Sequence, residues 1–153
     1  MLRRMQAINI YQVAGGILAA NAGALADLNR KQLMQGKGRD GKPLAPKYSE
    51  DPWFKTPQAA ANYAGWKHKL YPQTPYDVPN LIITGVYHAS ISVQASTDSL
   101  TYDASASFAG AIAGKYNNNA LGLNEDSKHT AVAQIVMEPL LNYVAANTGL
   151  KKS

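Results

Sequence analysis

Residues 36–43 (GKGRDGKP) have the spacing of a phosphate-binding loop, in which two glycines are separated by four residues and the second is followed by a lysine. In that motif the next residue is Ser or Thr, whose hydroxyl binds Mg²⁺, and main-chain N–H groups cradle the phosphates. Here the next residue is Pro43, which has neither a hydroxyl nor an N–H group. The segment also follows a predicted helix, whereas the motif joins a strand to a helix. We therefore expect a loop that binds no nucleotide cofactor.

Other side chains capable of catalysis or metal binding are scattered along the chain. No two of His68, His88 and His129 have the spacing that brings paired ligands together on one helix or strand. The chain has no cysteine, which excludes disulfides, thiolate ligands and a cysteine nucleophile. Ser90 and Ser92 lack the glycine-flanked turn that carries a hydrolase nucleophile. We therefore predict no catalytic residue, no metal site, no cofactor and no enzymatic activity.

Basic residues gather around the same loop. The chain carries 15 Lys and Arg against 10 Asp and Glu, a net charge of +5 that permits contact with nucleic acid without requiring it. The loop is either a solvated surface or a contact with a nucleic-acid backbone. Its three glycines make it costly to fix, so we expect it to be mobile until a partner orders it. Downstream aromatics, Trp53, Tyr63 and Trp66, either stack on bases or fill a core or interface. The candidate nucleic-acid-facing residues are Lys37, Arg39, Lys42 and Lys47.

The N-terminal 35 residues are predicted to form one long helix. Apolar residues recur at helical spacing over residues 5–35, with a kink or a close helix contact expected at Gly15-Gly16. Arg3 and Arg4 precede an uncharged run that resembles a secretory signal. Asn, Gln and Gly residues interrupt that run, so it is too polar for a bilayer. We expect a helix that packs within the protein or in a subunit interface, with no membrane partner.

The middle of the chain divides into a loop, a helix and a region of strands. Residues 36–55 form the basic Gly/Pro loop, and residues 56–80 hold a short helix, capped by Thr56, and a Pro-rich insertion. Residues 81–116 are predicted to form strands. The strand over residues 84–95 alternates, with Tyr87, Ala89, Ile91, Val93 and Ala95 on one face. A turn at 97–99 leads to its partner at 100–104, and residues 108–113 form a third strand; residues 81–83 are a further short β-branched run.

The C-terminal helix is predicted over residues 124–148. Asn124 caps it, and Glu125 and Asp126 lie in the first turn, where the helix dipole favours acids. Pro139 should bend the helix and Gly149 should end it. Its buried side is expected to consist of Ala131, Ile135, Met137, Leu140 or Leu141, and Val144. The 153 residues thus form one α+β domain, an antiparallel sheet of three or four strands packed by the two terminal helices.

The order of these features resembles the neck and tail-completion proteins (virion morphogenesis, minor tail, head-tail connector proteins) of tailed bacteriophages. The resemblance rests on residues 38–46 (GRDGKPLAP), 81–91 (LIITGVYHASI), 108–110 (FAG) and 122–126 (GLNED). The family pattern is a DG-x-x-W-A-P loop, then L-x-x-T-G-x-L-x-x-S-I, then an acidic-capped last helix. The chain departs from that pattern in three ways, which are Leu44 for Trp, Tyr87 for Leu, and an insertion over residues 48–79.

The resemblance implies a non-enzymatic component of the virion that assembles in the host cytoplasm. Such a protein forms a ring with copies of itself, as a head-to-tail connector or tail-completion protein, and contacts portal, neck or tail proteins. The basic loop would then face DNA in the channel without reading its sequence. An Ala-rich composition that buries little area per residue also favours association. The alternative is a soluble nucleic-acid-binding accessory protein that uses the basic loop, and a small hydrolase or transferase comes third.

Overall fold

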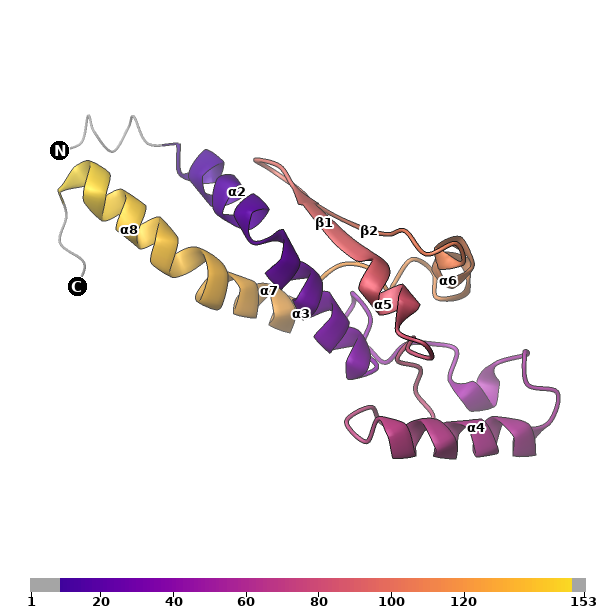
Figure 1. Cartoon of the computed structure of the whole chain (residues 1–153). Coiled ribbons are helices and arrows are strands. Elements are labelled where there is room, and N and C mark those ends of the chain that lie inside the picture. Colours follow the sequence, from indigo (N-terminus) through magenta and orange to yellow (C-terminus); the bar gives the residue numbers. More distant parts are fainter. Residues whose placement is uncertain (1–8, 150–153) are drawn as a thin grey trace.

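The computed structural model describes residues 9–149, which form an elongated arrangement of helices with one β-hairpin (Figure 1). The chain is therefore α+β, as the sequence predicts. In chain order the elements are α2 (Ile10–Ala20), α3 (Ala22–Met34), the 3-10 helix η1 (Tyr48–Glu50), α4 (Pro57–Leu70), α5 (Val86–Ser90), β1 (Ile91–Ala95), β2 (Leu100–Ala104), α6 (Ala109–Lys115), α7 (Glu125–Ala131), the π-helical η2 (Val132–Val136) and α8 (Met137–Thr148).

The N-terminal helix is broken at Asn21, so α2 and α3 replace the single helix predicted over residues 5–35. Asn9 caps α2, because its side chain accepts a hydrogen bond from the Gln12 N–H at 3.0 Å. The Asn21 side chain donates to the Ile17 carbonyl at 2.8 Å, a local bond that competes with regular helix. Residues 5–8 of the predicted helix lie outside the described residues. Over residues 9–149, no helix has the length and apolar content needed to cross a bilayer.

Gly15 makes a close contact, but with the turn of the hairpin rather than with a helix, and α2 continues through the glycine pair from Ile10 to Ala20. Gly15 is buried against the turn of the hairpin, where a Cβ atom would lie 3.1 Å from the Ser96 carbonyl oxygen and 3.1 Å from Thr97 Cα. A Cβ atom at Gly16 would meet nothing within 4 Å. Gly15 therefore allows the turn of the hairpin to lie directly on α2.

The hairpin agrees with the sequence-based prediction in the position of its turn and in its buried face. β1 and β2 are antiparallel, with Ile91 opposite Ala104, and the turn falls at residues 97–99. Ile91 and Val93 are buried, and Ser92 between them is exposed, as period-2 alternation predicts. The hairpin packs this buried face against α3.

Three segments predicted as strands are not strands, so residues 9–149 contain two strands rather than three or four. Residues 81–83 are irregular, residues 86–90 form α5, and residues 109–115 form α6. The alternation before Ile91 is misleading because Tyr87 and His88 are adjacent and both buried. The segment 108–113 is short and rich in Ala and Gly, so periodicity cannot distinguish strand from helix there.

The C-terminal helix begins and ends where predicted. The Asn124 side chain accepts from the Ser127 N–H at 2.9 Å, and Gly149 closes α8 in the left-handed conformation (φ 72°). Pro139 lies in the first turn of α8, directly after the π-helical segment η2. A proline cannot donate to the preceding turn, and a π-helical segment is one way in which a helix accommodates this loss.

The start of helix α4 also follows from the sequence. The Thr56 hydroxyl accepts from the Ala59 N–H at 3.1 Å and Pro57 occupies the first helical position, so the predicted N-cap of α4 is confirmed. The core lies between α3, the hairpin, α6 and α7. Its largest members include Leu25, Leu33, Leu44, Tyr87, Ile91 and Leu123.

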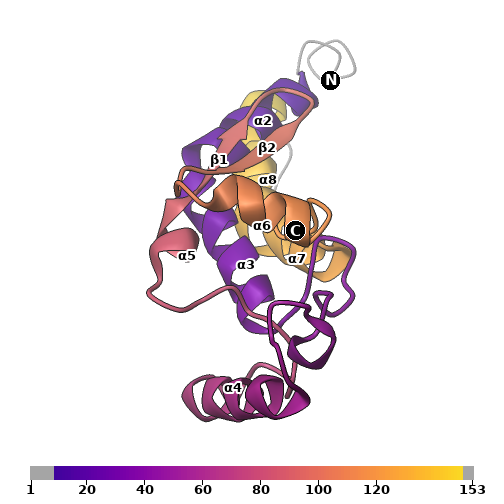
Figure 2. The ribbon, with the colours of Figure 1, turned by 90° about the vertical axis from the view of Figure 1, so that its right-hand side faces the viewer.

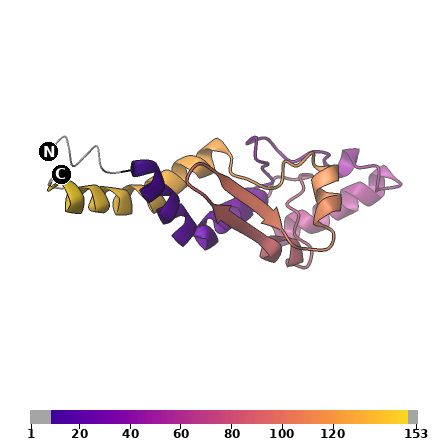
Figure 3. The same ribbon diagram turned by 90° about the horizontal axis from the view of Figure 1, so that it is seen from above.

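The molecule has two distinct ends. At one end α2 packs against η2 and α8, and we call these three helices the arm. At the other end α4 and η1 pack together beyond the core. Figures 2 and 3, seen from two further directions, agree with Figure 1 in separating α8 from α4 along the length of the molecule.

Candidate functional site

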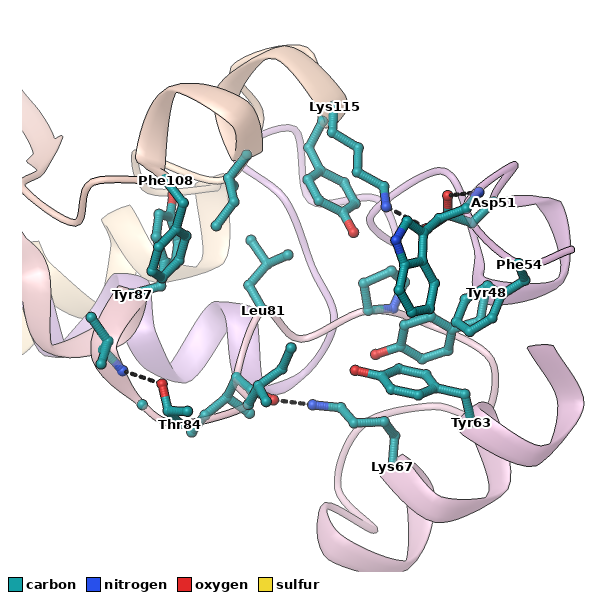
Figure 4. A pocket seen from close by; sticks show the side chains of 18 residues that line it. Tyr48, Asp51, Phe54, Tyr63, Lys67, Leu81, Thr84, Tyr87, Phe108 and Lys115 are labelled. Carbon is teal, nitrogen blue, oxygen red and sulfur yellow. Dashed lines mark hydrogen bonds and ion pairs between the residues drawn. The ribbon is translucent and has the colours of Figure 1, made fainter. Parts of the chain in front are cut away.

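An aromatic groove of about 530 Å³ lies at the α4 end of the molecule (Figure 4). Its walls come from η1 and the loop after it, from α4, from the irregular segment before α5, and from α6. Residue types are mixed, but the largest side chains are aromatic: Tyr48, Trp53, Phe54, Tyr63, Tyr87, Phe108 and Tyr116.

The aromatic rings at one side of the groove pack edge to face. The ring centroids of Tyr48 and Tyr63 are 5.0 Å apart at 77°, and those of Trp53 and Phe54 are 4.9 Å apart at 89°. This arrangement is favourable because the positive ring edge meets the negative ring face. Trp53 nevertheless leaves 68% of its surface exposed. The rings thus form a wall that is internally packed and still open to a ligand.

Two lysines and one aspartate bring charge to this groove. Asp51 is buried and forms an ion pair with Lys115, which links the loop after η1 to α6. The other carboxylate oxygen of Asp51 accepts a hydrogen bond from the main-chain N–H of Trp53 at 3.0 Å. Lys67 on α4 donates to the Ile82 carbonyl, and its Nζ lies 4.7 Å from the centre of the Tyr71 ring. The groove therefore holds one ion pair and one further buried amine.

Burial changes the acidity of several of these groups. Desolvation lowers the pKa of the Lys67 amine to about 8. Burial, together with the charge of Asp51, raises the pKa of Tyr116 to about 12, and burial raises that of Tyr87 to about 12. The tyrosines are thus neutral at physiological pH, and the groove presents apolar, hydrogen-bonding walls rather than phenolate charge.

The predicted nucleic-acid-facing residues lie on and after a tight turn. The Gly38 N–H donates to the Lys42 carbonyl at 2.8 Å, and Lys37 bridges to Pro43. The turn therefore brings Lys37, Arg39 and Lys42 together, with Arg39 and Lys42 exposed. Lys47 is exposed at the N-cap of η1. None of the four forms an ion pair with another residue between 9 and 149.

The turn is fixed to the loop before α7 through Asn119. The Arg39 N–H donates to the Asn119 carbonyl at 2.7 Å, and the Asp40 N–H donates to the Asn119 side chain at 3.1 Å. The hydrogen bond from Asn119 lowers the pKa of Asp40 and keeps it ionised. Gly38 allows this approach, since a Cβ atom there would lie 2.1 Å from Asn119 Nδ2. These contacts, and the fully buried Leu44 that follows, argue against the mobile loop expected from the sequence.

The histidines that the sequence analysis considered have separate structural environments. His68 Nδ1 donates to the Thr74 carbonyl at 3.1 Å, and His88 Nε2 donates to the Asn80 carbonyl at 2.8 Å. His129 is exposed on α7. Among residues 9–149, no three His, Asp or Glu side chains lie close enough together to hold a metal ion.

The serines and acids considered as candidates have local partners. The Ser90 hydroxyl donates to the Tyr87 carbonyl at 2.8 Å, and Ser92 is exposed on β1. Glu125 pairs with Lys128 at 2.7 Å, and this hydrogen bond lowers the pKa of Glu125. Glu125 thus lies in the first turn of α7, where acids are favoured, as predicted.

Buried amides are the polar residues that the sequence analysis missed. Asn29 donates to the Ala120 carbonyl at 3.0 Å and accepts from the Gly122 N–H at 3.2 Å. Gln32, one turn further on α3, makes a similar pair of bonds to residues 122 and 124. The signal was present in the sequence as two amides, three residues apart, between the apolar Leu25 and Leu33. Helix periodicity alone classifies such residues as solvent-facing.

The arm exposes apolar side chains that were predicted to be buried. Ala131 is buried, and Ile135, Leu140 and Val144 are partly buried, as expected. Met137 is instead 42% exposed, and of the alternatives Leu140 and Leu141 it is Leu140 that lies on the buried side, while Leu141 is 44% exposed. This correction arises because one face of η2 and α8 packs on α2 and no described element covers the other. The exposed apolar residues of the arm are Ile10, Tyr11, Val132, Met137, Leu141 and Tyr143.

Comparison of the chain with protein-family models, with curated proteins and with solved structures finds no match in any of the three. The function is therefore argued from the groove, the turn and the arm.

Proposed function

We propose that the chain is a non-enzymatic structural component of a phage particle, a ring-forming head-to-tail connector or tail-completion protein. The observation that carries the proposal is the presence of two different exposed apolar surfaces, the arm and the aromatic groove, at opposite ends of one chain. A ring needs such a pair, since each subunit contacts its two neighbours through two different patches.

The energetics favour association. Large exposed apolar patches on a small protein mark interaction sites, because each large side chain removed from water stabilises a complex by about 1.5–3 kcal/mol when burial is complete. Tyr11 and Trp53, at the two ends, are 79% and 68% exposed. Aromatic residues of this kind are enriched among those that dominate binding energy at interfaces.

Two residues that depart from the phage-protein pattern are buried in the hydrophobic core, and this supports the proposal. Leu44 stands where the pattern has Trp, and Tyr87 where it has Leu. Both belong to the hydrophobic core, with 0% and 3% of their surfaces exposed. The substitutions thus keep an apolar contact at both positions, as that resemblance requires.

The basic turn gives the proposed ring a surface for DNA. Lys37, Arg39 and Lys42 on the turn, and Lys47 after it, carry positive charge that no described acid neutralises by an ion pair. In a ring lumen they would contact phosphates without reading sequence, and such contacts weaken as salt rises.

A second candidate is a soluble nucleic-acid-binding accessory protein. The observation that favours it is that the same basic turn occurs in a chain with two exposed tryptophans, Trp53 at 68% and Trp66 at 47%. Exposed aromatic rings beside positive charge bind single strands by stacking and phosphate contact.

Native mass spectrometry of the purified full-length chain, with analytical ultracentrifugation over a range of concentrations, separates the two candidates. The connector proposal expects a closed species of many copies. A chain that stays monomeric at high concentration and binds single-stranded DNA would overturn it and support the accessory protein.

A further inference from the structure

We propose that the outer edge of β2 pairs with the same edge of a second copy, so that two hairpins join into one four-stranded antiparallel sheet across a two-fold axis at Thr101. The pairing uses neither the groove nor the exposed apolar residues of the arm, so it goes beyond the proposed ring. The partner of this edge is thus a second copy of this chain.

The hydrogen bonds at the two ends of the hairpin show which main-chain groups point outward. At the turn the Ser96 N–H donates to the Ser99 carbonyl at 2.9 Å, and at the open end the Ser105 N–H donates to the Ser90 carbonyl at 3.2 Å. Both pairs continue the register of β1 and β2. Bonded and non-bonded pairs alternate along an antiparallel ladder, so every second residue of β2, starting at Leu100, directs its N–H and C=O groups away from β1.

Two contacts agree with this direction. The outward carbonyl of Ile91 on β1 accepts a hydrogen bond from the Arg30 guanidinium at 2.8 Å. The outward N–H of Ala104 on β2 donates to the carboxylate of the neighbouring Asp103 at 2.8 Å. In both cases a side chain supplies the hydrogen bond that a further strand would supply.

Leu100 and Tyr102 have no such substitute. Their outward N–H and C=O groups have no hydrogen-bond partner among residues 9–149. Leu100 is 36% exposed, and Thr101 beside it is exposed as well. β1 packs on α2 and α3, whereas β2 packs mainly on β1 and the short α5. An open edge with unpaired main-chain groups is a template for another strand.

The same edge of a second copy matches these free groups. In an antiparallel pair with its two-fold axis at Thr101, Leu100 of one copy lies opposite Tyr102 of the other, and the two residues exchange both hydrogen bonds. The symmetry repeats this pair on the other side of the axis. Every free group of the two edges is then used, and the bond between Ala104 and Asp103 stays in place.

The exposed side chains of β2 also favour this register. Thr101 faces Thr101 of the second copy, a pair that forms hydrogen bonds across strands. Asp103 faces Ser99 of the second copy, whose hydroxyl is a donor for the carboxylate, so the two copies of Asp103 do not oppose each other. Residues 96–105 contain no Lys, Arg or Pro, which commonly protect an edge strand from pairing.

Disulfide trapping tests the pairing, and the absence of native cysteines gives it a clean background. Full-length Thr101→Cys is oxidised mildly and should form a covalent dimer, since the Cα atoms of this opposed pair lie about 4.5 Å apart. The matched control is Gln94→Cys, which is opposite Thr101 on β1 and exposed on the same face. Its two copies would lie three strand spacings apart, about 14 Å. Thr101→Cys should therefore cross-link about tenfold faster than the control, which is beyond the reach of a disulfide.

Amide hydrogen exchange of the unmodified chain is an independent measurement. The amides of Leu100 and Tyr102 should exchange rapidly in dilute solution and about tenfold more slowly once the chain is concentrated enough to dimerise. The amide of Thr101 faces Gln94 within the hairpin and should be protected at both concentrations.

A matched pair of charges tests the two-fold axis. Thr101→Lys places like charges directly opposite each other and should weaken the dimer by about fivefold or more. Gln94→Lys adds the same charge one strand away from the edge and should leave the dimer unchanged. Sedimentation equilibrium measures both, and unchanged unfolding temperatures confirm that the variants fold.

The outcomes separate this inference from the proposed function. If the wild-type chain forms rings but Thr101→Cys cross-links no faster than Gln94→Cys, the inference is overturned and the ring stands. If Thr101→Cys cross-links selectively and no species larger than a dimer forms, the edge pairing is supported and the ring is overturned. Fast exchange of the two edge amides at high concentration, or protection that survives in Thr101→Lys, overturns the inference whatever the cross-linking result.

Discussion

The side-chain oxygen of Gln32 accepts a hydrogen bond from the main-chain N–H of Asn124 at 2.8 Å, and so connects α3 to the cap of α7. The same side chain donates to the Gly122 carbonyl at 3.0 Å, and all these groups are buried. Residues 122–124 lack a sheet or helix partner of their own at this point. The side-chain amides of α3 therefore make the hydrogen bonds that a helix or sheet would otherwise provide for the main chain of this segment.

Replacing Gln32 with Leu should lower the free energy of unfolding by about 2–4 kcal/mol. The variant leaves the Asn124 N–H and the Gly122 carbonyl buried without partners, and each such group costs about 1–3 kcal/mol. Urea unfolding followed by circular dichroism measures the loss. Lys31→Leu, at an exposed position next to it on α3, is the control and should change stability by less than about 0.5 kcal/mol. Equal stability of the two variants would contradict the assigned bonding.

The two faces of β1 should respond oppositely to charge. Ile91→Asp places an unpaired carboxylate in the core and should cost about 3 kcal/mol or more. Ser92→Asp, on the exposed face, should be nearly neutral in the isolated chain. Thermal and urea unfolding of both variants test the register, and equal losses would show that it is wrong.

Gly15 and Gly16 form a matched pair. Gly16→Ala should stabilise the chain by about 0.5–1 kcal/mol, because alanine favours helix and the added methyl group meets open space. Gly15→Ala should lose that gain, since the added methyl group presses on the Ser96 and Thr97 main chain at 3.1 Å. Gly15→Leu should destabilise by about 1–3 kcal/mol through overpacking. A gain in stability from both alanine variants would show that the hairpin turn does not rest on α2.

His88 should make stability fall as the solution becomes mildly acidic. Burial lowers the pKa of its ring, the charges of Arg30 and Lys67 act in the same direction, and the hydrogen bond to Asn80 opposes them. Because the unfolded chain then binds the proton first, stability is complete above the ordinary histidine pKa of about 6.5 and decreases as pH falls through the folded pKa.

Urea unfolding measured between pH 7.5 and pH 5 tests this dependence. The variant His88→Gln removes the titrating ring and should show a smaller slope of unfolding free energy against pH, whatever its absolute stability. An unchanged slope would assign the pH dependence to other groups.

Removing the charge of the basic turn should affect the handling of DNA without affecting folding or assembly. We expect the combined change of Lys37, Arg39, Lys42 and Lys47 to Gln to leave stability and ring formation intact while impairing retention or passage of DNA. Assembly and packaged DNA are measured in this variant, and binding of the purified chain to DNA is measured against salt. An unchanged DNA readout would place the turn on a solvated rim. Loss of assembly would mean that these residues pair with acids of a neighbouring subunit.

Local rules were sufficient where one signal decides the structure. The caps at Thr56 and Asn124, the end at Gly149, and the alternation at Ile91 and Val93 were all predicted correctly. Each depends on a few neighbouring residues. The resemblance to phage proteins and the DNA-facing role of the turn stay predictions.

The errors arose where distant residues decide. Tyr87 and His88 are both buried, and the His88 ring bonds to the Asn80 carbonyl, a contact that no periodicity encodes. The loop of three glycines is fixed by Asn119, about 80 residues away in sequence. The aromatic groove combines η1, α4 and α6, whose association depends on the whole fold. Met137 was predicted to be buried because its place in the helix pattern does not show whether the packing partner is this chain or another.

The order of the helices along the chain has a consequence for synthesis on the ribosome. The arm joins α2, one of the first elements to emerge, with η2 and α8, the last ones described. The groove is lined by residues 48–116, but its walls are held in place by the whole fold. A chain that ends before η2 therefore leaves α2 without the two helices on which it packs. The apolar side chains of α2 stay exposed to water until the last helix has left the ribosome, so the arm is the last part of the molecule to form.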